Sequence, residues 1–125
     1  MIQGIGVDII EIGRIRTSVE TVGQAFLERI FTASEIAYCS SKHNCYQHFA
    51  ARFAAKEAVS KALSTGWAGA FRWKDVEITN DVSGQPHVTL HGHLQDSLAS
   101  ATIHVSISHS DTHVVAMVVI EGRLL

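Results

Sequence analysis

Several features that mark whole classes of protein are scarce in this sequence. Its two cysteines, Cys39 and Cys45, are too few for a disulfide framework and lack a CxxC spacing. The longest uninterrupted apolar run, Val114 to Ile120, has seven residues, whereas a membrane-spanning helix needs roughly 20. The first residues, MIQGIGVDIIE, lack the basic segment of a signal peptide. We therefore expect a cytoplasmic protein with free thiols and no membrane partner.

Charge of one sign and proline are also scarce. Ten lysines and arginines stand against twelve aspartates and glutamates, so the strong basic excess of a nucleic-acid-binding domain is missing and we expect no nucleic-acid partner. One proline and the absence of low-complexity segments argue against disorder. A length of 125 residues favours a single domain over 1–125. Enzymes of this size often complete their site with a neighbouring subunit.

The hydrophobic pattern predicts an α+β fold with a mainly antiparallel sheet. A β-rich run covers 2–10, and apolar residues at steps of three and four predict one helix over 12–29. Thr32-Ala-Ser-Glu35 has the form of a capping box. An alanine-rich stretch predicts the longest helix over 45–64. We expect later strands at 76–79, 87–90, 104–110 and 114–121, with a short helix at 94–100.

Asp8 is the unusual residue of the first strand. Aspartate is depleted in strands, and burying its carboxylate among isoleucine and valine without a partner is costly. Two interpretations are open. The side chain either caps the helix that follows or binds a hard cation, for which carboxylate oxygens are suitable ligands.

Charged residues also interrupt the alanine-rich helix. Arg52, Lys56 and Ser60 are spaced so that they share one face, and Glu57 and Lys61 stand four residues apart, as in an exposed ion pair. Such charges usually form a solvated face. Their apolar surroundings indicate a buried helix instead, in which two bases and an acid are suited to hold a phosphate together with a divalent cation.

Three histidines complete the candidates from the residues alone. His109 ends an alternating strand and is either a core histidine bonded to a hydroxyl or a phosphate contact or proton carrier. His91 and His93 are too few for a zinc site, so we expect surface residues. A P-loop, a dinucleotide fingerprint in the right context and a nucleophile elbow are all missing from the sequence. The residues therefore predict a Mg²⁺ and phosphate site near Asp8 and Glu57.

Three segments, in order along the chain, resemble the small type of 4'-phosphopantetheinyl transferase, the holo-acyl-carrier-protein synthase family. They are GIGVDIIEI at 4–12, RFAAKEAVSKA at 52–62 and VSISHS at 105–110. The resemblance implies a 4'-phosphopantetheinyl transferase-like fold, a mainly antiparallel sheet with a long central helix. It also implies the reaction. A serine hydroxyl of apo acyl carrier protein attacks the β-phosphorus of coenzyme A, and adenosine 3',5'-bisphosphate leaves.

The resemblance also carries residue roles. Asp8 and Glu57 match the Mg²⁺ ligands of the family, and Lys61 matches the lysine that we assign to a coenzyme A phosphate, so these three are the catalytic candidates. The serine proton goes either to Glu57 or to a water at the metal site. The other residues that fall in segments lining the coenzyme A site are Arg52, Ser60, Gly66 and His109.

The implied partner is a small acidic helical protein, the acyl carrier protein of fatty-acid or polyketide synthesis. Arg14 and Arg16 on the first helix are the docking candidates, although they are equally well explained as ordinary surface arginines. The small members of the family form homotrimers with active sites between subunits, and we expect the same here. The competing functions are a metal-dependent hydrolase of coenzyme A and a binding module without turnover.

Overall fold

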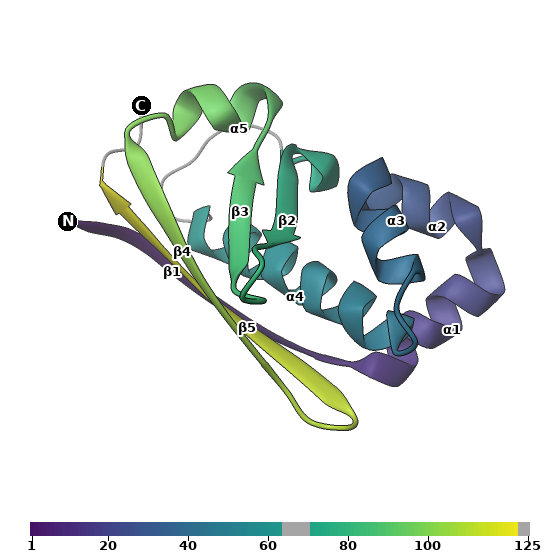
Figure 1. Ribbon diagram of the computed structural model, residues 1–125. Coiled ribbons are helices and arrows are strands. Elements are labelled where there is room, and N and C mark those ends of the chain that lie inside the picture. The colour runs from purple at the N-terminus through teal and green to yellow at the C-terminus, as the bar shows by residue number, and fades with distance from the viewer. Residues whose placement is uncertain (64–70, 123–125) are drawn as a thin grey trace.

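The computed structural model of the chain describes residues 1–63 and 71–122 and confirms the α+β fold. Figure 1 shows the arrangement. The elements in chain order are β1 (Ile2–Glu11), α1 (Ile12–Val22), α2 (Gln24–Ile30), α3 (Ala33–Ser40), α4 (Cys45–Leu63), the short 3-10 helix η1 (Trp73–Asp75), β2 (Val76–Asn80), β3 (Pro86–Leu90), α5 (Gly92–Ser97), β4 (Ala101–His109) and β5 (His113–Gly122).

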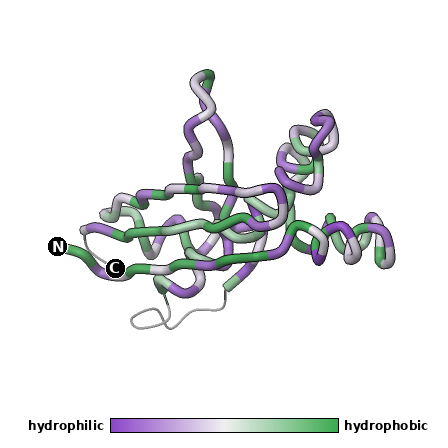
Figure 2. The backbone as a smooth tube through the Cα atoms, turned by 90° about the horizontal axis from the view of Figure 1, so that it is seen from below, coloured by the Kyte–Doolittle hydropathy of each residue, from purple (hydrophilic) through white to green (hydrophobic). Residues whose placement is uncertain are grey.

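Two separate antiparallel sheets replace the single sheet expected. The larger one has the order β1-β5-β4, so the first strand pairs with the last, and Asp8 lies opposite Ala116. The smaller one is the hairpin β2-β3. Figure 2 shows the hydrophobic colour along most of β1 and β5. Both faces of the larger sheet therefore carry apolar side chains, although α4 covers only one of them.

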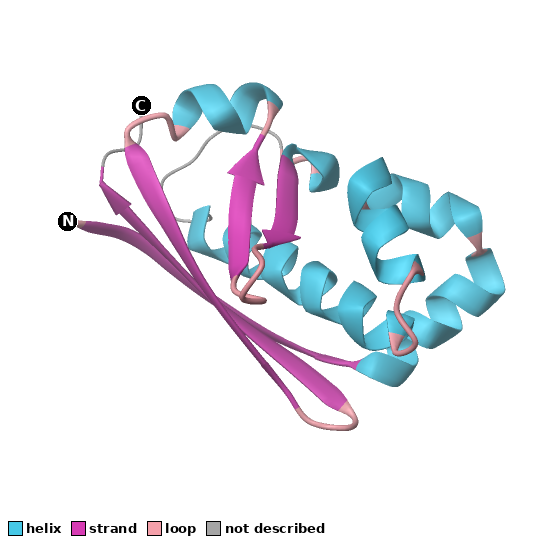
Figure 3. Cartoon of the chain, viewed as in Figure 1, coloured by secondary structure: helices cyan, strands magenta, loops and turns pink. Residues whose placement is uncertain are grey.

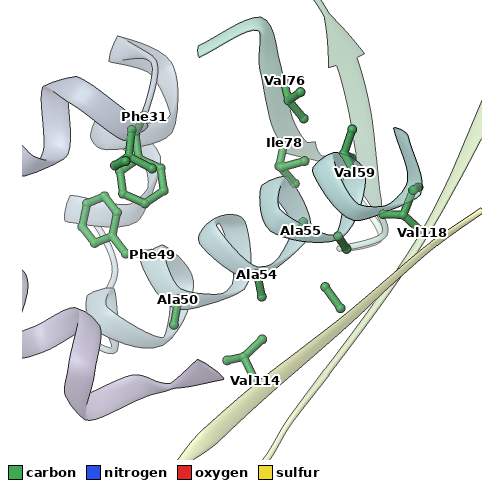
Figure 4. Close-up of a cluster of buried hydrophobic side chains, with 14 of the residues drawn as sticks. Phe31, Phe49, Ala50, Ala54, Ala55, Val59, Val76, Ile78, Val114 and Val118 are labelled. Carbon is green, nitrogen blue, oxygen red and sulfur yellow. The ribbon is translucent and has the colours of Figure 1, made fainter. Parts of the chain in front are cut away.

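Helix α4 lies at the centre of the fold, between the larger sheet and the hairpin (Figures 1 and 4). Alternate residues of β5, from Val114 to Ile120, are fully buried against it. Phe49 of α4 packs against Phe31, with ring centroids 5.1 Å apart. Helices α1, α2 and α3 gather around the N-terminal end of α4 (Figure 3). None of the helices in 1–63 and 71–122 is long and apolar enough to cross a bilayer.

The helix predicted over 12–29 is broken at Gly23, so one long helix was the wrong prediction. Gly23 has φ 79°, a conformation that side-chain-bearing residues rarely adopt. It ends α1 and begins α2, where its carbonyl accepts a hydrogen bond from the amide of Phe26 at 3.0 Å. The capping box at Thr32 and Glu35 is confirmed and begins α3.

Two glycines of β1 bring its backbone directly onto α4. A Cβ added to Gly6 would lie 1.9 Å from the carbonyl oxygen of Ala58, and one added to Gly4 would lie 2.0 Å from that of Ala62. No side chain fits at either position. The backbone contact fixes the distance between β1 and α4 and the stretch of α4 that lies beside Asp8.

We predict that Gly6→Ala lowers the free energy of unfolding by about 2 kcal/mol, the usual cost of overpacking. The added methyl must push β1 away from α4. Gly13→Ala is the matched control, because a Cβ there meets nothing within 4 Å, and helix propensity should stabilise it by up to about 1 kcal/mol. Urea unfolding followed by circular dichroism measures both. An unchanged midpoint for Gly6→Ala would contradict the backbone contact.

Candidate active site

The structure brings Asp8 and Lys61 together from β1 and α4. The Lys61 ammonium donates hydrogen bonds to Asp8 Oδ1 at 2.9 Å and to the carbonyl oxygen of Val7 at 3.2 Å. The side chain of Asp8 is 15% exposed and that of Lys61 52%, so the pair is open to solvent on one side. The helix-capping interpretation of Asp8 is wrong, because Glu11 is the N-cap of α1 and makes no side-chain capping bond.

Glu57 is the second carboxylate of this site. Burial raises its pKa, and the negative charge of Asp8 raises it further, while Lys61 opposes the shift. The two carboxylates therefore lie within electrostatic range of each other. Lys61 forms its ion pair with Asp8 across two elements, and Asp8 is also the main cause of its raised pKa, with Glu57 contributing less. The exposed Glu57–Lys61 pair expected from helix spacing is thus not the main contact of Lys61.

This arrangement suits a hard divalent cation. Two repelling carboxylates supply oxygen ligands, and a cation between them would relieve the repulsion that raises the pKa of Glu57. The described residues contain no group of three or more His, Cys, Asp or Glu side chains that could hold a metal ion. Mg²⁺ commonly binds through one or two carboxylates and fills its other positions with water and substrate phosphate, so the pair is sufficient.

A second cluster lies around the ring of Tyr38, with members from α3, from α4 and from the loop between them. The Lys42 ammonium lies 4.7 Å from the ring centroid and the Arg52 guanidinium carbon 4.4 Å. His48 meets the same ring edge-on at 5.7 Å. Two positively charged side chains therefore lie close together over one aromatic ring.

Arg52 is buried without a full set of partners. It is 3% exposed and donates from Nη2 to Asn80 Oδ1 at 2.8 Å, but its Nε has no hydrogen-bond acceptor among the residues that the structure describes. The ion pairs found in 1–63 and 71–122 give Arg52 no carboxylate. A cavity of about 240 Å³ lies beside it, lined also by Tyr38 and Asn80. Because buried polar groups are rarely left unsatisfied, this guanidinium is suited to an external anion.

The positive charges around Tyr38 also affect the pKa of His48. Burial lowers it first, and the charges of Arg52, Lys42 and His109 lower it further. His109 therefore lies within electrostatic range of the cluster, at the exposed end of β4. The core-histidine interpretation of His109 is wrong, whereas a phosphate contact stays a prediction. We call the group Tyr38, Lys42, His48, Arg52 and His109 the cationic cluster.

Arg52, Lys56 and Ser60, which share one face of α4, do not form a single phosphate site as expected. Lys56 is fully buried and pairs with Glu35 at 2.8 Å, so it takes no part in either site. Ser60 is half-buried and precedes Lys61 on α4. His91 and His93 are exposed, as expected, and His91 bonds Glu77 at 3.1 Å. Gly66 lies outside the described residues.

Arg14 and Arg16 are exposed on α1, which agrees with both interpretations of them, and the docking role stays a prediction. The Arg16 guanidinium carbon lies 5.1 Å from the ring centroid of Tyr46. Tyr38, Lys42 and His48 of the cationic cluster were not among the residues predicted for the site. His48 and Arg52 stand four residues apart on one helix, which is a visible signal, whereas Lys42 lies in the loop between α3 and α4 and reaches Tyr38 only through the fold.

Comparison with known proteins defines the class. A sequence model of the 4'-phosphopantetheinyl transferase superfamily matches residues 4–118. The holo-[acyl-carrier-protein] synthase of Koribacter versatilis is 44% identical over 124 residues, which are 97% of this chain and 99% of the relative. That of Chlamydia trachomatis serovar D is 48% identical over 118 residues, 94% of this chain and 98% of the relative.

A solved structure agrees with the sequence relatives. The holo-(acyl-carrier-protein) synthase of Bacillus anthracis, crystallised in complex with CoA (3',5'-ADP), superposes with a TM-score of 0.81 at 38% identity. The match covers 98% of this chain and 99% of that one. The chain therefore belongs to the holo-acyl-carrier-protein synthase family of the 4'-phosphopantetheinyl transferases, and the resemblance of its three motifs is confirmed.

Proposed function

We propose that this enzyme transfers the 4'-phosphopantetheine arm of coenzyme A to a serine of apo acyl carrier protein. The serine oxygen forms a bond to the β-phosphorus and loses its proton either to Glu57 or to a water at the site. The bond between that phosphorus and the bridging pyrophosphate oxygen breaks, and adenosine 3',5'-bisphosphate leaves. The juxtaposition of Asp8, Glu57 and Lys61 carries the proposal, since it sets two metal-binding carboxylates beside a cation that can contact phosphate.

Asp8 and Glu57 are the residues that would hold Mg²⁺. Bound there, the ion would neutralise the charge that develops on the pyrophosphate oxygens. Lys61 is half-exposed, and its flexible stem lets the ammonium bind a phosphate oxygen beside the carboxylates. Asp8 and Glu57 are only partly buried, so the site stays open on one side to substrate and to the waters that Mg²⁺ keeps.

Coenzyme A carries a second anionic group, the 3'-phosphate, and the cationic cluster is suited to it. Arg52 precedes Glu57 by five residues on α4, which is a rise of about 7.5 Å along the helix and a rotation of about 140° around it. A ligand with a pyrophosphate and a phosphate on one ribose would reach from one site to the other across α4. We assign Arg52, Lys42 and His109 to the 3'-phosphate. Ser60 stays a coenzyme A contact by resemblance, as does Gly66.

The acyl carrier protein partner would dock on α1. Arg14 and Arg16 present positive charge to solvent near the beginning of α1, directly after the strand that carries Asp8. Such exposed charges steer an acidic partner and raise its association rate at low salt. Fatty-acid synthesis is the pathway that we expect to use the product. A cytoplasmic location is supported by the free thiols of Cys39 and Cys45.

We further propose that the chain is one domain, 1–125, that assembles as a homotrimer. The face of the larger sheet that points away from α4 bears Ile5, Val7 and Ile9, which are 60%, 55% and 66% exposed, with Met117 of β5 beside Val7. Monomeric proteins rarely expose so continuous an apolar surface. Further copies of the chain are the occupants that the family resemblance implies, and they would complete the active sites at the subunit boundaries.

The intact mass of apo acyl carrier protein after incubation with this enzyme, coenzyme A and Mg²⁺ tests the reaction. We expect a gain of one phosphopantetheine arm, lost when EDTA removes the metal. Glu57→Gln should keep the fold and lose turnover by at least about 100-fold, because an amide is a poor Mg²⁺ ligand. Release of adenosine 3',5'-bisphosphate with no gain in protein mass would indicate a hydrolase instead.

Binding of coenzyme A can be compared with that of dephospho-coenzyme A, which lacks the 3'-phosphate, to tell the two proposed anion sites apart. Lys42→Gln and Arg52→Gln should weaken coenzyme A binding roughly tenfold, the usual loss for a charge-assisted hydrogen bond, and leave dephospho-coenzyme A unaffected. Lys61→Ala should weaken both ligands. Calorimetry measures the dissociation constants, with the exposed Lys74→Gln as control. Equal losses for both ligands in Arg52→Gln would remove the cationic cluster from the 3'-phosphate.

The oligomeric state tests the apolar sheet face. Light scattering after gel filtration should give a particle of three chains of 13.6 kDa. Ile5→Lys should reduce it to one chain, because burying an unpaired ammonium in the interface is unfavourable. Val82→Lys is the control, since Val82 is fully exposed at the tip of the β2-β3 hairpin. A wild-type particle of one chain would contradict the trimer.

A further inference from the structure

The side of α4 that faces the larger sheet is packed mainly through apolar and backbone contacts. They come from small residues of α4, Ala54 and Ala58 among them, from the two β1 glycines and from buried branched residues of β5 such as Val118. These contacts fix the distance between strand and helix. Apolar packing is not directional, so it fixes the rotation of a helix less sharply than a hydrogen-bonded pair does.

On the opposite side of α4, the ammonium of Lys56 makes hydrogen bonds to three acceptors. Lys56 Nζ donates to Glu35 Oε1 at 2.8 Å, to the carbonyl oxygen of Trp73 at 2.9 Å and to that of Val76. These acceptors come from α3, η1 and β2. An ammonium has three donors in fixed tetrahedral directions, so all three are satisfied at a single position of Lys56.

Glu35 is held as firmly as Lys56. Its carboxylate accepts hydrogen bonds from the backbone amides of Thr32 and Ile78, each at 2.8 Å, in addition to the bond from Lys56. Both side chains of the pair have no exposed surface. A buried pair of this kind contributes little net stability compared with apolar side chains of the same volume, which suggests that its value lies in geometry.

We infer that Glu35 and Lys56 are positioning residues that set the rotation of α4 and so fix Glu57 opposite Asp8. Lys56 and Glu57 are neighbours, about 100° apart around the helix. A roll of about 20° would move a carboxylate that lies about 6 Å from the helix axis by about 2 Å. Misplacement by about 1 Å can lower a rate by about 100-fold. Lys61 and Lys42 have long flexible stems and tolerate such a shift, whereas a pair of metal ligands does not.

The test rests on the proposed transfer reaction and separates rate from binding. Glu35→Asp keeps the charge and shortens the side chain by one methylene, so the pair re-forms only if α4 moves. The double variant E35Q/K56M removes both charges and leaves no unpaired carboxylate in the interior. We expect both variants to lower kcat at least tenfold, with the KM for coenzyme A and its calorimetric dissociation constant without metal within about twofold of wild type.

The melting temperature of each variant is measured together with its kcat. The single variant Lys56→Met should have a lower melting temperature than E35Q/K56M, because it leaves Glu35 buried and unpaired. Leu98→Ala removes a buried side chain at the end of α5, and it should lower the melting temperature with kcat unchanged. If kcat of Glu35→Asp and of the double variant matches wild type, the positioning role is overturned. If wild type itself transfers nothing, the proposed function is overturned instead.

Discussion

The backbone contact between β1 and α4 is the constraint on which the rest of the structure depends. Gly4 and Gly6 rest on the carbonyl oxygens of Ala62 and Ala58, one helical turn apart. Asp8 follows two residues after Gly6 on the same face of the strand, so the contact carries its carboxylate to Lys61. Any side chain at either glycine would enlarge the gap that this ion pair spans. The active site is thus a direct product of strand-on-helix packing.

Helix α4 divides the chemistry of the site into two regions. Glu57 and Lys61 face β1, the edge strand of the larger sheet, where metal and pyrophosphate are proposed to bind. Arg52 and Lys56 face α3 and β2. Arg52 keeps one donor without a protein partner, while Lys56 has every donor satisfied inside the molecule. Two neighbouring bases of one motif therefore differ in role, because one retains capacity for a ligand and the other does not.

Much of this was predictable from the sequence where a local rule applied. The capping box at Thr32, the alternation of β4 and the alanine-rich α4 depend on neighbouring residues alone. The break at Gly23 was missed because the apolar spacing continues through Phe26, although the glycine was a visible signal. The Glu35–Lys56 pair was beyond sequence reasoning, since twenty-one positions separate residues that only tertiary packing brings together. Asp8 and Lys61 were placed in one site by the resemblance, but their ion pair, which spans 53 positions, also comes only from tertiary packing.

The pairing of β1 with β5 has a consequence for synthesis of the protein. The strand that carries Asp8 is made first, yet its hydrogen-bonded neighbour spans His113–Gly122. A nascent chain therefore holds all the proposed catalytic side chains long before it can fix their geometry, and such long-range pairing folds slowly. Competence for catalysis arrives only with the last strand, so chains released early from the ribosome would lack a formed metal site.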